Sequence, residues 1–350
     1  MRSFDYTKLK DRKWDSEILG LVAQIHEFKG RQELYLQQKP AELDRLIEIA
    51  KVQSTEASNE IEGIRTTNTR LKQLCEEKTM PRNRDEEEIM GYRDVLNTIH
   101  ESYDYIPINS NYILQLHRDL YKYSEKGIGG HFKNTQNYIS SRDDTGNEFI
   151  LFTPLAPYEV SAAVNDICES YSRVEDTQDI DALILIPIFI HDFLCIHPFN
   201  DGNGRMSRLL TTLMLYKSGY MVGKYISLES KIAKNKQLYY AALEKCQHGW
   251  HENKEYPAPF IKYLLKTIIA AYRDFEDRVN IVSEKLSAVD IVRKAVYGKI
   301  GKFTKSDIME MCPTIGKTSV ESSIKKLVDS GDIIKCGSGR ATFYIRSDSQ

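Results

Sequence analysis

Thirteen consecutive residues, 196–208, hold the side chains best suited to chemistry in this 350-residue chain. His197 can accept a proton from a hydroxyl group at neutral pH. Asp201 supplies a hard carboxylate oxygen of the kind that Mg²⁺ prefers. Gly202 and Gly204 let the backbone approach an anion closely, and a helix that begins there directs its N–H groups at phosphate. Together these residues predict the transfer of a phosphorus-centred group.

Three further side chains of the same stretch extend this prediction. Arg205 and Arg208 are three positions apart, so on a helix they share a face and both can reach a polyphosphate. We expect Asn203 to cap that helix at its N-terminus. Each feature alone is common at helix ends and turns, but their combination in one loop favours a functional site.

Helices must position this loop, because most of residues 1–280 shows apolar side chains at helical spacing. The expected helices cover residues 14–25, 43–52, 87–99, 113–121, 160–171, 183–196, 205–216 and 260–281. The helix over 183–196 should end at His197, because Pro198 disfavours helical geometry in the residue before it.

Residues 137–152 break the helical pattern and predict a β-hairpin. Strands are expected at 137–141 and 148–152, with the polar residues 142–147 as the turn. A hairpin alone is only marginally stable. We therefore expect it to pack beside the candidate site as a flap.

The C-terminal residues have a different pattern from the rest of the chain. Helices are expected at 288–298, 304–309 and 317–328, with a turn at 312–316 and a closing hairpin of 333–336 and 342–345. This is the element order of a winged-helix domain. Acidic residues are interspersed among its basic ones, so we favour recognition of a protein target or partner and keep DNA binding open. The basic residues are Lys317, Lys325, Lys326, Lys335 and Arg340.

The overall composition argues against two classes of protein. With 48 Lys+Arg against 50 Asp+Glu, the formal charge of −2 does not indicate a protein that binds polyanions over its whole surface. No segment approaches the ~18 uninterrupted apolar residues of a membrane span, and no apolar signal core opens the chain. The six cysteines form no CxxC pair, which is typical of free thiols in a reducing compartment. We expect a cytoplasmic protein.

The stretch from His197 to Arg208 is similar, at every defining position, to the signature of the Fic family, His-Pro-Phe-x-Asp-Gly-Asn-Gly-Arg-x-x-Arg. The resemblance implies a mainly α fold, with a Fic-type helical core, a β-hairpin flap and here an added winged-helix domain. It also implies a protein adenylyltransferase, which moves AMP from ATP to a Tyr, Ser or Thr hydroxyl of a target protein or of itself. ATP is then the co-substrate, and Mg²⁺ the metal ion.

The resemblance assigns a role to each residue of the signature. His197 would deprotonate the target hydroxyl, and Phe199 would anchor the loop in the core. Asp201 would hold Mg²⁺ against the α- and β-phosphates. The phosphate groups would be bound by Gly202, Asn203, Gly204, Arg205 and Arg208.

The predicted hairpin lies where the family has a flap that aligns the target peptide by strand addition and covers the nucleotide. Two departures concern its contacts, because Lys133 stands where arginine is common and Ser140–Ser141 where glycines are common. Tyr239 and Tyr240 resemble a tyrosine pair near the adenine, although packing between helices explains them equally well. The expected flap contacts are Ile139, Ser140 and Ser141.

Upstream, Ser58, Glu62 and Gly63 resemble the family's inhibitory motif, Ser-x-x-x-Glu-Gly, on a helix of about residues 54–63. The i, i+4 spacing places Ser58 and Glu62 on one helix face, and Gly63 can end the helix. A Glu62 carboxylate paired with Arg208 would occupy the partner of the γ-phosphate. We therefore expect an autoinhibited enzyme, in which Glu62→Gly raises AMP transfer and His197→Ala abolishes it.

These expectations divide the chain into an N-terminal helical region (1–110), a Fic catalytic core (111–282) and a winged-helix domain (286–347). Two alternatives stay open. One is an enzyme on the same scaffold that uses another nucleotide or phosphorus donor, or removes AMP. The other is a DNA-binding regulator whose core senses a nucleotide, although a sensor needs no general base at His197. The family analogy also suggests a homodimer, and the sequence does not specify the target protein.

Overall fold

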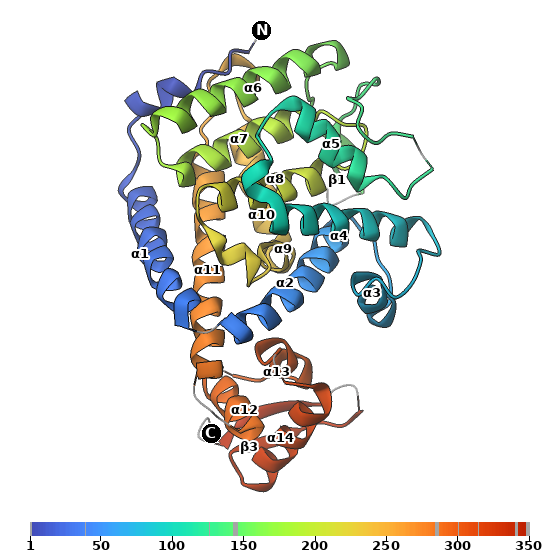
Figure 1. Ribbon diagram of the computed structural model, residues 1–350, viewed down its shortest axis with the longest axis vertical. Helices are drawn as coiled ribbons and strands as arrows, with labels where there is room; N and C mark the ends of the chain where they lie inside the picture. The colour runs from blue at the N-terminus through green and yellow to red at the C-terminus, as the bar shows by residue number, and fades with distance from the viewer. Residues whose placement is uncertain are drawn as a thin grey trace. The chain divides into compact units, whose positions relative to one another are not determined.

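The computed structural model describes residues 2–38, 40–125, 127–142, 146–283, 287–299, 301–313, 315–339 and 342–347. It is mainly helical, as expected, with two short β-hairpins (Figure 1). The chain separates into two compact units, one made of residues 1–30 and 50–271 and the other of residues 31–49 and 272–350. The three predicted domains, with their boundaries at 110/111 and 282/286, stay predictions.

Helices surround the candidate loop in the first unit. Parts of α1, α2 and α11 belong to the second unit. In chain order, the elements are η1 (Tyr6–Asp11), α1 (Ser16–Gln38), α2 (Pro40–Ile61), α3 (Asn68–Cys75), α4 (Arg84–Ser102), η2 (Tyr103–Tyr105), α5 (Ser110–Leu120), β1 (Ile139–Arg142), β2 (Glu148–Phe152), α6 (Pro157–Thr177), α7 (Ala182–Ile196), α8 (Asn203–Lys217), η3 (Met221–Lys224), α9 (Leu228–Lys234), α10 (Lys236–Gln247), η4 (Trp250–Glu252) and α11 (Ala258–Ser283).

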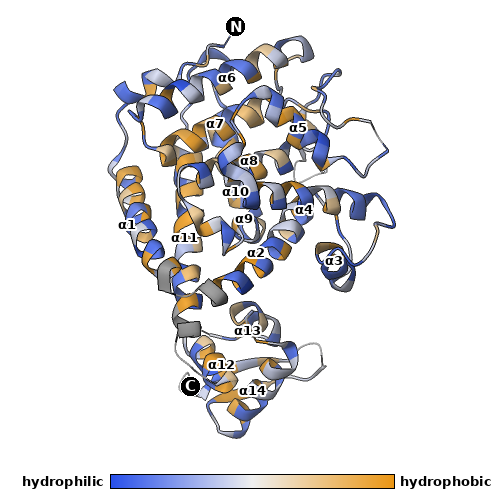
Figure 2. Cartoon of the chain, viewed as in Figure 1, coloured by the Kyte–Doolittle hydropathy of each residue, from blue (hydrophilic) through white to orange (hydrophobic). Residues whose placement is uncertain are grey.

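Helix α7 forms the centre of this unit. Every residue from Leu183 to Ile196 is buried, and Figure 2 shows the helix as apolar over most of its length. A helix that is apolar on all sides must be covered on all sides, and α7 contacts α6, α8 and α10. The loop between α7 and α8, which carries the candidate catalytic residues, is therefore held by the most buried part of the fold.

Each predicted helix is present, and the segment expected at about 54–63 is the C-terminal part of α2, continuous with the helix predicted at 43–52. Three short helices, α3, α9 and α10, were not predicted. Among the described residues, no helix is both long and apolar enough to cross a membrane.

The predicted flap is an antiparallel hairpin of β1 and β2. Its register pairs Ser140 with Ile150 and Arg142 with Glu148, with an irregularity between Ile139 and Ser140. Residues 143–145 of the predicted turn lie outside the described residues. At its base, the hairpin is anchored by Phe152, whose ring stacks on His251 with centroids 5.3 Å apart.

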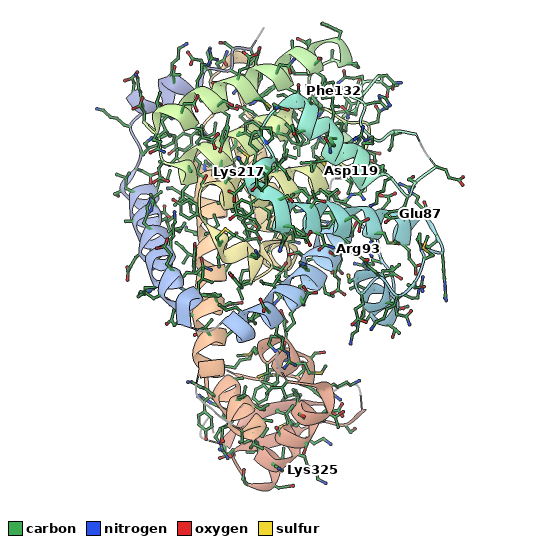
Figure 3. The ribbon with its side chains drawn as sticks, in the orientation of Figure 1. Glu87, Arg93, Asp119, Phe132, Lys217 and Lys325 are labelled. Atoms are coloured by element: carbon green, nitrogen blue, oxygen red, sulfur yellow. The ribbon has the colours of Figure 1, made fainter. Side chains whose placement is uncertain are left out.

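The second unit has its own hydrophobic core, built from residues such as Val296, Ile308 and Leu327. Its C-terminal elements are α12 (Ala288–Tyr297), α13 (Lys305–Met311), α14 (Lys317–Asp329), β3 (Ile333–Cys336) and β4 (Phe343–Arg346). This order matches the predicted one, and the winged-helix assignment stays a prediction. Lys325, labelled in Figure 3, is exposed on α14, as are Lys317 and Lys326, and Lys335 is exposed on β3. Thr314 of the predicted turn and Arg340 lie outside the described residues.

Candidate active site

His197 directly follows α7 and adopts a left-handed backbone conformation, with φ 52° and ψ 64°. The helix ends there, as the His-Pro pair predicts. The Nδ1 atom lies 3.2 Å from the Leu194 carbonyl oxygen. Because a carbonyl only accepts, Nδ1 carries the proton in this contact and Nε2 keeps its lone pair. Burial lowers the pKa of His197 to about 4, so the ring is neutral at pH 7 and able to accept a proton.

Phe199 fixes the loop in the core. Its fully buried ring stacks on His117, with centroids 3.7 Å apart and planes 4° apart, and also contacts Phe132, which Figure 3 labels. His117 in turn donates from Nε2 to the Asp201 carbonyl and accepts the Gly130 N–H at Nδ1. The His117 imidazole, protonated on Nε2, therefore joins α5 to the loop of Asp201 and to the loop of Gly130.

Asn203 does not cap α8, contrary to the prediction. The N-cap is Gly202, at φ +87°, and no side-chain cap bond is made. The Asn203 amide instead closes the loop, since it accepts the Phe199 N–H at 2.9 Å and donates to the Phe199 carbonyl at 2.7 Å. The turn that Gly202 allows directs the amide back at Phe199. Phosphate binding by Asn203 would thus use its backbone N–H at the start of α8.

Arg208, which is buried, is the point where the segment of Ser58 and Glu62, predicted to be inhibitory, meets the signature loop. Its Nε donates to the Ser58 hydroxyl at 2.8 Å, and its Nη2 donates to the Ser58 carbonyl at 2.9 Å and to Glu62 Oε1 at 2.7 Å. Burial opposes the charge of Arg208, but the Glu62 carboxylate outweighs it and raises the pKa of the guanidinium. Gly63, at φ +82°, lies just beyond the end of α2.

The Glu62 carboxylate also lies against the N-terminal turn of α8. A Cβ atom at Gly204 would lie 2.2 Å from Glu62 Oε1. A side chain at position 204 would displace the Glu62 carboxylate from this place. An anion at a helix N-terminus, bonded to an arginine, occupies the position suited to a phosphate group.

Arg205 takes a different direction from Arg208. It is almost fully buried, and its Nη2 lies 2.7 Å from Glu88 Oε2 and 2.7 Å from the Tyr121 hydroxyl. The Nε and Nη1 atoms of Arg205 have no hydrogen-bond partner among the described residues. Glu88 also accepts from Arg84 Nε at 2.6 Å. Arg205 and Arg84, which share Glu88 as a partner, supply positive charge near the start of α8.

The side chain of Asp201 is partly exposed, and its Oδ1 accepts the Gly202 N–H at 2.7 Å. Arg84 Nη2 lies 3.5 Å from its Oδ2. No cluster of three or more His, Cys, Asp and Glu side chains that could hold a metal occurs in the described part of the chain. A single carboxylate at the mouth of a polar cavity fits Mg²⁺ that arrives with a polyphosphate and keeps several waters. It does not fit a metal held by protein ligands alone.

Residues of the signature loop, the hairpin and the segment of Glu62 line one cavity of about 550 Å³, a size typical of small-molecule sites. Tyr239 is buried behind Arg208, while the ring of Tyr240 is half exposed at the cavity wall, so the two tyrosines are not equivalent. The predicted site residues on its wall are Glu62, Ile139, Ser140, Ser141, His197, Asp201, Gly202, Asn203, Gly204, Arg205, Arg208, Tyr239 and Tyr240. Ser58 reaches the site through Arg208.

Residues 107–215 match the model of the Fic/DOC family. The chain therefore carries a Fic domain. The matched segment includes the hairpin and the whole loop from His197 to Arg208, but neither Ser58 and Glu62 nor the tyrosine pair.

Relatives with curated names share part of this sequence. The chain is 27% identical over 208 residues to protein adenylyltransferase fic-1 of Caenorhabditis elegans, covering 58% of this chain and 36% of the relative. It is 23% identical over 216 residues to protein adenylyltransferase Fic of Nematostella vectensis, covering 59% and 46%. The chain thus spans about a third to a half of the length of these relatives.

Solved structures confirm the Fic fold. A Fic family protein from Desulfovibrio desulfuricans G20 matches with a TM-score of 0.62 at 20% identity, covering 96% of this chain and 97% of that one. Fic-1 from C. elegans matches with a TM-score of 0.61 at 21% identity, covering 76% and 74%.

Several residues that shape the Fic domain's site were not predicted. Glu88, Tyr121 and His117 are buried around the loop, and Lys236 donates to the carbonyl of Ile61 at the end of α2. A buried glutamate within a helix resembles any other helical glutamate in the sequence. Only its pairing with Arg205, 117 positions away in the chain (205 − 88), distinguishes it.

Proposed function

We propose that this chain is an autoinhibited protein adenylyltransferase, which transfers AMP from ATP to a hydroxyl group of a target protein. The Fic domain and the names of its relatives support the reaction class. The single observation that carries the regulatory part is the Glu62 carboxylate, which lies 2.7 Å from Arg208 Nη2 inside the cavity.

The chemical step uses His197 as the general base. Nε2 takes the proton of the target hydroxyl, and the hydroxyl oxygen attacks the α-phosphorus of ATP. The bond from the α-phosphorus to the oxygen that bridges it to the β-phosphate breaks, and pyrophosphate leaves. The neutral ring, fixed through Leu194, suits this role because it needs no prior loss of a proton.

The leaving pyrophosphate would lie at the start of α8. The N–H groups of Asn203–Arg205 and the side chains of Arg205 and Arg208 can stabilise its developing charge. Mg²⁺ bound through Asp201 would neutralise further charge on the phosphate oxygens.

Inhibition follows from competition for Arg208 and for the α8 N-terminus. While Glu62 holds both, a γ-phosphate meets a carboxylate where it needs cationic donors, and like charges repel. ATP then binds weakly or in a pose that does not align the α-phosphorus with the target. Removing the Glu62 carboxylate would free both groups.

The test of the donor uses purified Glu62→Ala protein and ATP labelled at either the α- or the γ-phosphate, with a protein extract as the source of targets. Relative to the extract without this enzyme, we expect additional label on protein from the α-phosphate and no additional label from the γ-phosphate. The variant Glu62→Ala/His197→Ala should add none from either.

Other outcomes of the same experiment distinguish the remaining alternatives. Label from the γ-phosphate would replace AMP transfer by phosphate transfer, and stronger labelling with another nucleotide would replace ATP as donor. Loss of label from previously labelled protein would indicate removal of AMP. Label on the enzyme itself would identify self-modification.

A further inference from the structure

The segment Lys133–Asn137 runs alongside the loop of His197 and leads directly into the hairpin. Hydrogen bonds join it to three consecutive loop residues. The Lys133 N–H donates to the Pro198 carbonyl at 2.8 Å, and Asn137 Nδ2 donates to the Phe199 carbonyl at 3.1 Å. The side chain of Asn200 contacts both Asn134 and Thr135, at 3.2 Å each. The segment is thus bonded along its length to the loop that bears the base.

Lys133 is the buried anchor of this segment, with 3% of its surface exposed. Its Nζ donates to Asn137 Oδ1 at 2.7 Å and approaches the Ile196 carbonyl oxygen at 3.4 Å. Ile196 is the last residue of α7, so the ammonium group lies at a helix C-terminus, where a cation is favoured. Burial lowers the pKa of Lys133 to about 8, and the charge of Glu159 opposes this only in part.

Asn137 connects this cation to the far side of the loop. Its amide oxygen accepts from Lys133, and its amide nitrogen donates to the Phe199 carbonyl. Lys133 contacts Ile196, just before His197, and Asn137 contacts Phe199, two residues after it. The hydrogen bond between Lys133 and Asn137 joins these two contacts. Two residues further along, Ile139 begins β1 of the hairpin.

We propose that Lys133 is a positioning residue, which clamps the His197 loop through Ile196 and Asn137 and sets the hairpin at a fixed distance from the base. A target hydroxyl presented beside the hairpin must reach Nε2 of His197 within hydrogen-bond range. A brace bonded to both elements fixes that distance. This inference rests on the proposed function, because it takes His197 as the base.

The charge of Lys133 also acts on the base. His197 has two charged neighbours with opposite effects on its pKa, since Lys133 lowers it and Glu62 raises it, while the Leu194 carbonyl accepts its proton. Burial is the main cause of the low pKa of His197 and stays in place when Lys133 is replaced by methionine, so this change should raise that pKa only modestly above about 4. Arginine at this position keeps the charge.

The kinetic test compares Lys133→Met and Lys133→Arg, each in the Glu62→Ala protein. We expect Lys133→Met to lower kcat about 100-fold with little change in the KM for ATP, since misplacement by about 1 Å costs that much. Lys133→Arg should restore most of the rate. If methionine gives the same kcat as lysine, the proposal is wrong.

Two readouts need no AMP transfer, so they separate this inference from the proposed function. NMR titration of His197 should show a higher pKa in Lys133→Met, and amide hydrogen exchange in β1 should become faster. An unchanged pKa together with unchanged exchange would overturn the clamp, whatever the enzyme transfers.

A second variant guards against misfolding. Asn137→Asp keeps an oxygen partner for Lys133 but loses the donor to the Phe199 carbonyl. We expect an intermediate loss of kcat and a folded protein by circular dichroism. A kcat in the Glu62→Ala protein equal to that of Glu62→Ala alone would remove Asn137 from the clamp.

Discussion

At the scale of single residues, the site is defined by which polar groups already have partners. Glu62 satisfies Arg208, Glu88 satisfies part of Arg205, and the Leu194 carbonyl fixes the tautomer of His197. Arg208 is blocked by its pair with Glu62, whereas His197 keeps Nε2 available because Leu194 binds the other ring nitrogen. Substitutions of residues that look alike in the sequence should therefore have different effects, as two neighbouring glutamates illustrate.

Glu88→Gln should destabilise the fold, because it removes the nearer carboxylate of a buried ion pair and leaves Arg205 with only Asp201 Oδ1, at 3.7 Å. Breaking such a pair costs about 3–5 kcal/mol. Glu87, labelled in Figure 3, is partly exposed on the same helix and provides the matched control. Glu87→Gln should change stability by less than about 0.5 kcal/mol. Urea denaturation measures both, and equal losses would contradict the assigned role of Glu88.

Buried histidines should make the protein less stable in mild acid. Burial lowers the pKa of His117 and of His191 to about 4, and that of His100 to about 3, so the folded state resists protonation. The unfolded state, with an ordinary pKa near 6.5, binds these protons first. Stability should therefore fall as the pH drops from about 6.5 toward 4, by at most about 1.4 kcal/mol per pH unit for each histidine.

Denaturation of His117→Gln between pH 7 and pH 5 tests this, with exposed His248→Gln as the control. The His117 variant should lose part of the pH dependence, and the His248 variant should keep it. The same slope in both would show that buried histidines do not cause the acid sensitivity.

At the scale of elements, three helix ends meet around one cavity. The C-terminus of α7 presents His197, the N-terminus of α8 presents its N–H groups, and the end of α2 carries Glu62. Lys236 on α10 donates to the carbonyl of Ile61 and so holds the end of α2 in place. The contact of Glu62 with Arg208, which we propose to be inhibitory, is thus supported by an element distant from it in sequence.

Lys236→Met should weaken this support and partly relieve inhibition. We expect a rise in AMP transfer that is smaller than that of Glu62→Ala, because Glu62 itself remains. Lys245→Met removes an exposed lysine from the same helix and should leave the rate unchanged. A Lys236 variant that is no more active than the Lys245 variant would contradict the role of Lys236.

Much of this arrangement was predictable from local pattern. The apolar run of α7, the Pro198 stop and the strand–turn–strand pattern of the hairpin each depend on neighbouring residues. The cap of α8 was not, because Asn203 is well suited to capping and only the turn at Gly202 directs its amide to Phe199. Helix α10 was also missed, although buried Tyr239, Leu243 and Cys246 have helical spacing. Pairings across the chain, such as Glu88 with Arg205, leave no local trace.

At the scale of the whole molecule, the residues that make up the candidate site all belong to the first compact unit. The second unit has a separate core and contributes no described residue to the cavity. Its exposed lysines on α14 and β3 stay a candidate surface for a target or partner. We therefore propose that the first unit contains both the catalytic residues and the glutamate that inhibits them.

The most direct test of that claim is the rate of AMP transfer, from ATP labelled at the α-phosphate, by Glu62→Ala relative to the unaltered protein. The matched control is Glu60→Ala, an exposed glutamate on α2 that pairs with Arg65 outside the cavity. A hydrogen bond to a charged group is worth about 1.5–3 kcal/mol. We therefore predict a rise of about 10- to 100-fold for Glu62→Ala and none for Glu60→Ala. Equal rates for all three proteins would contradict it.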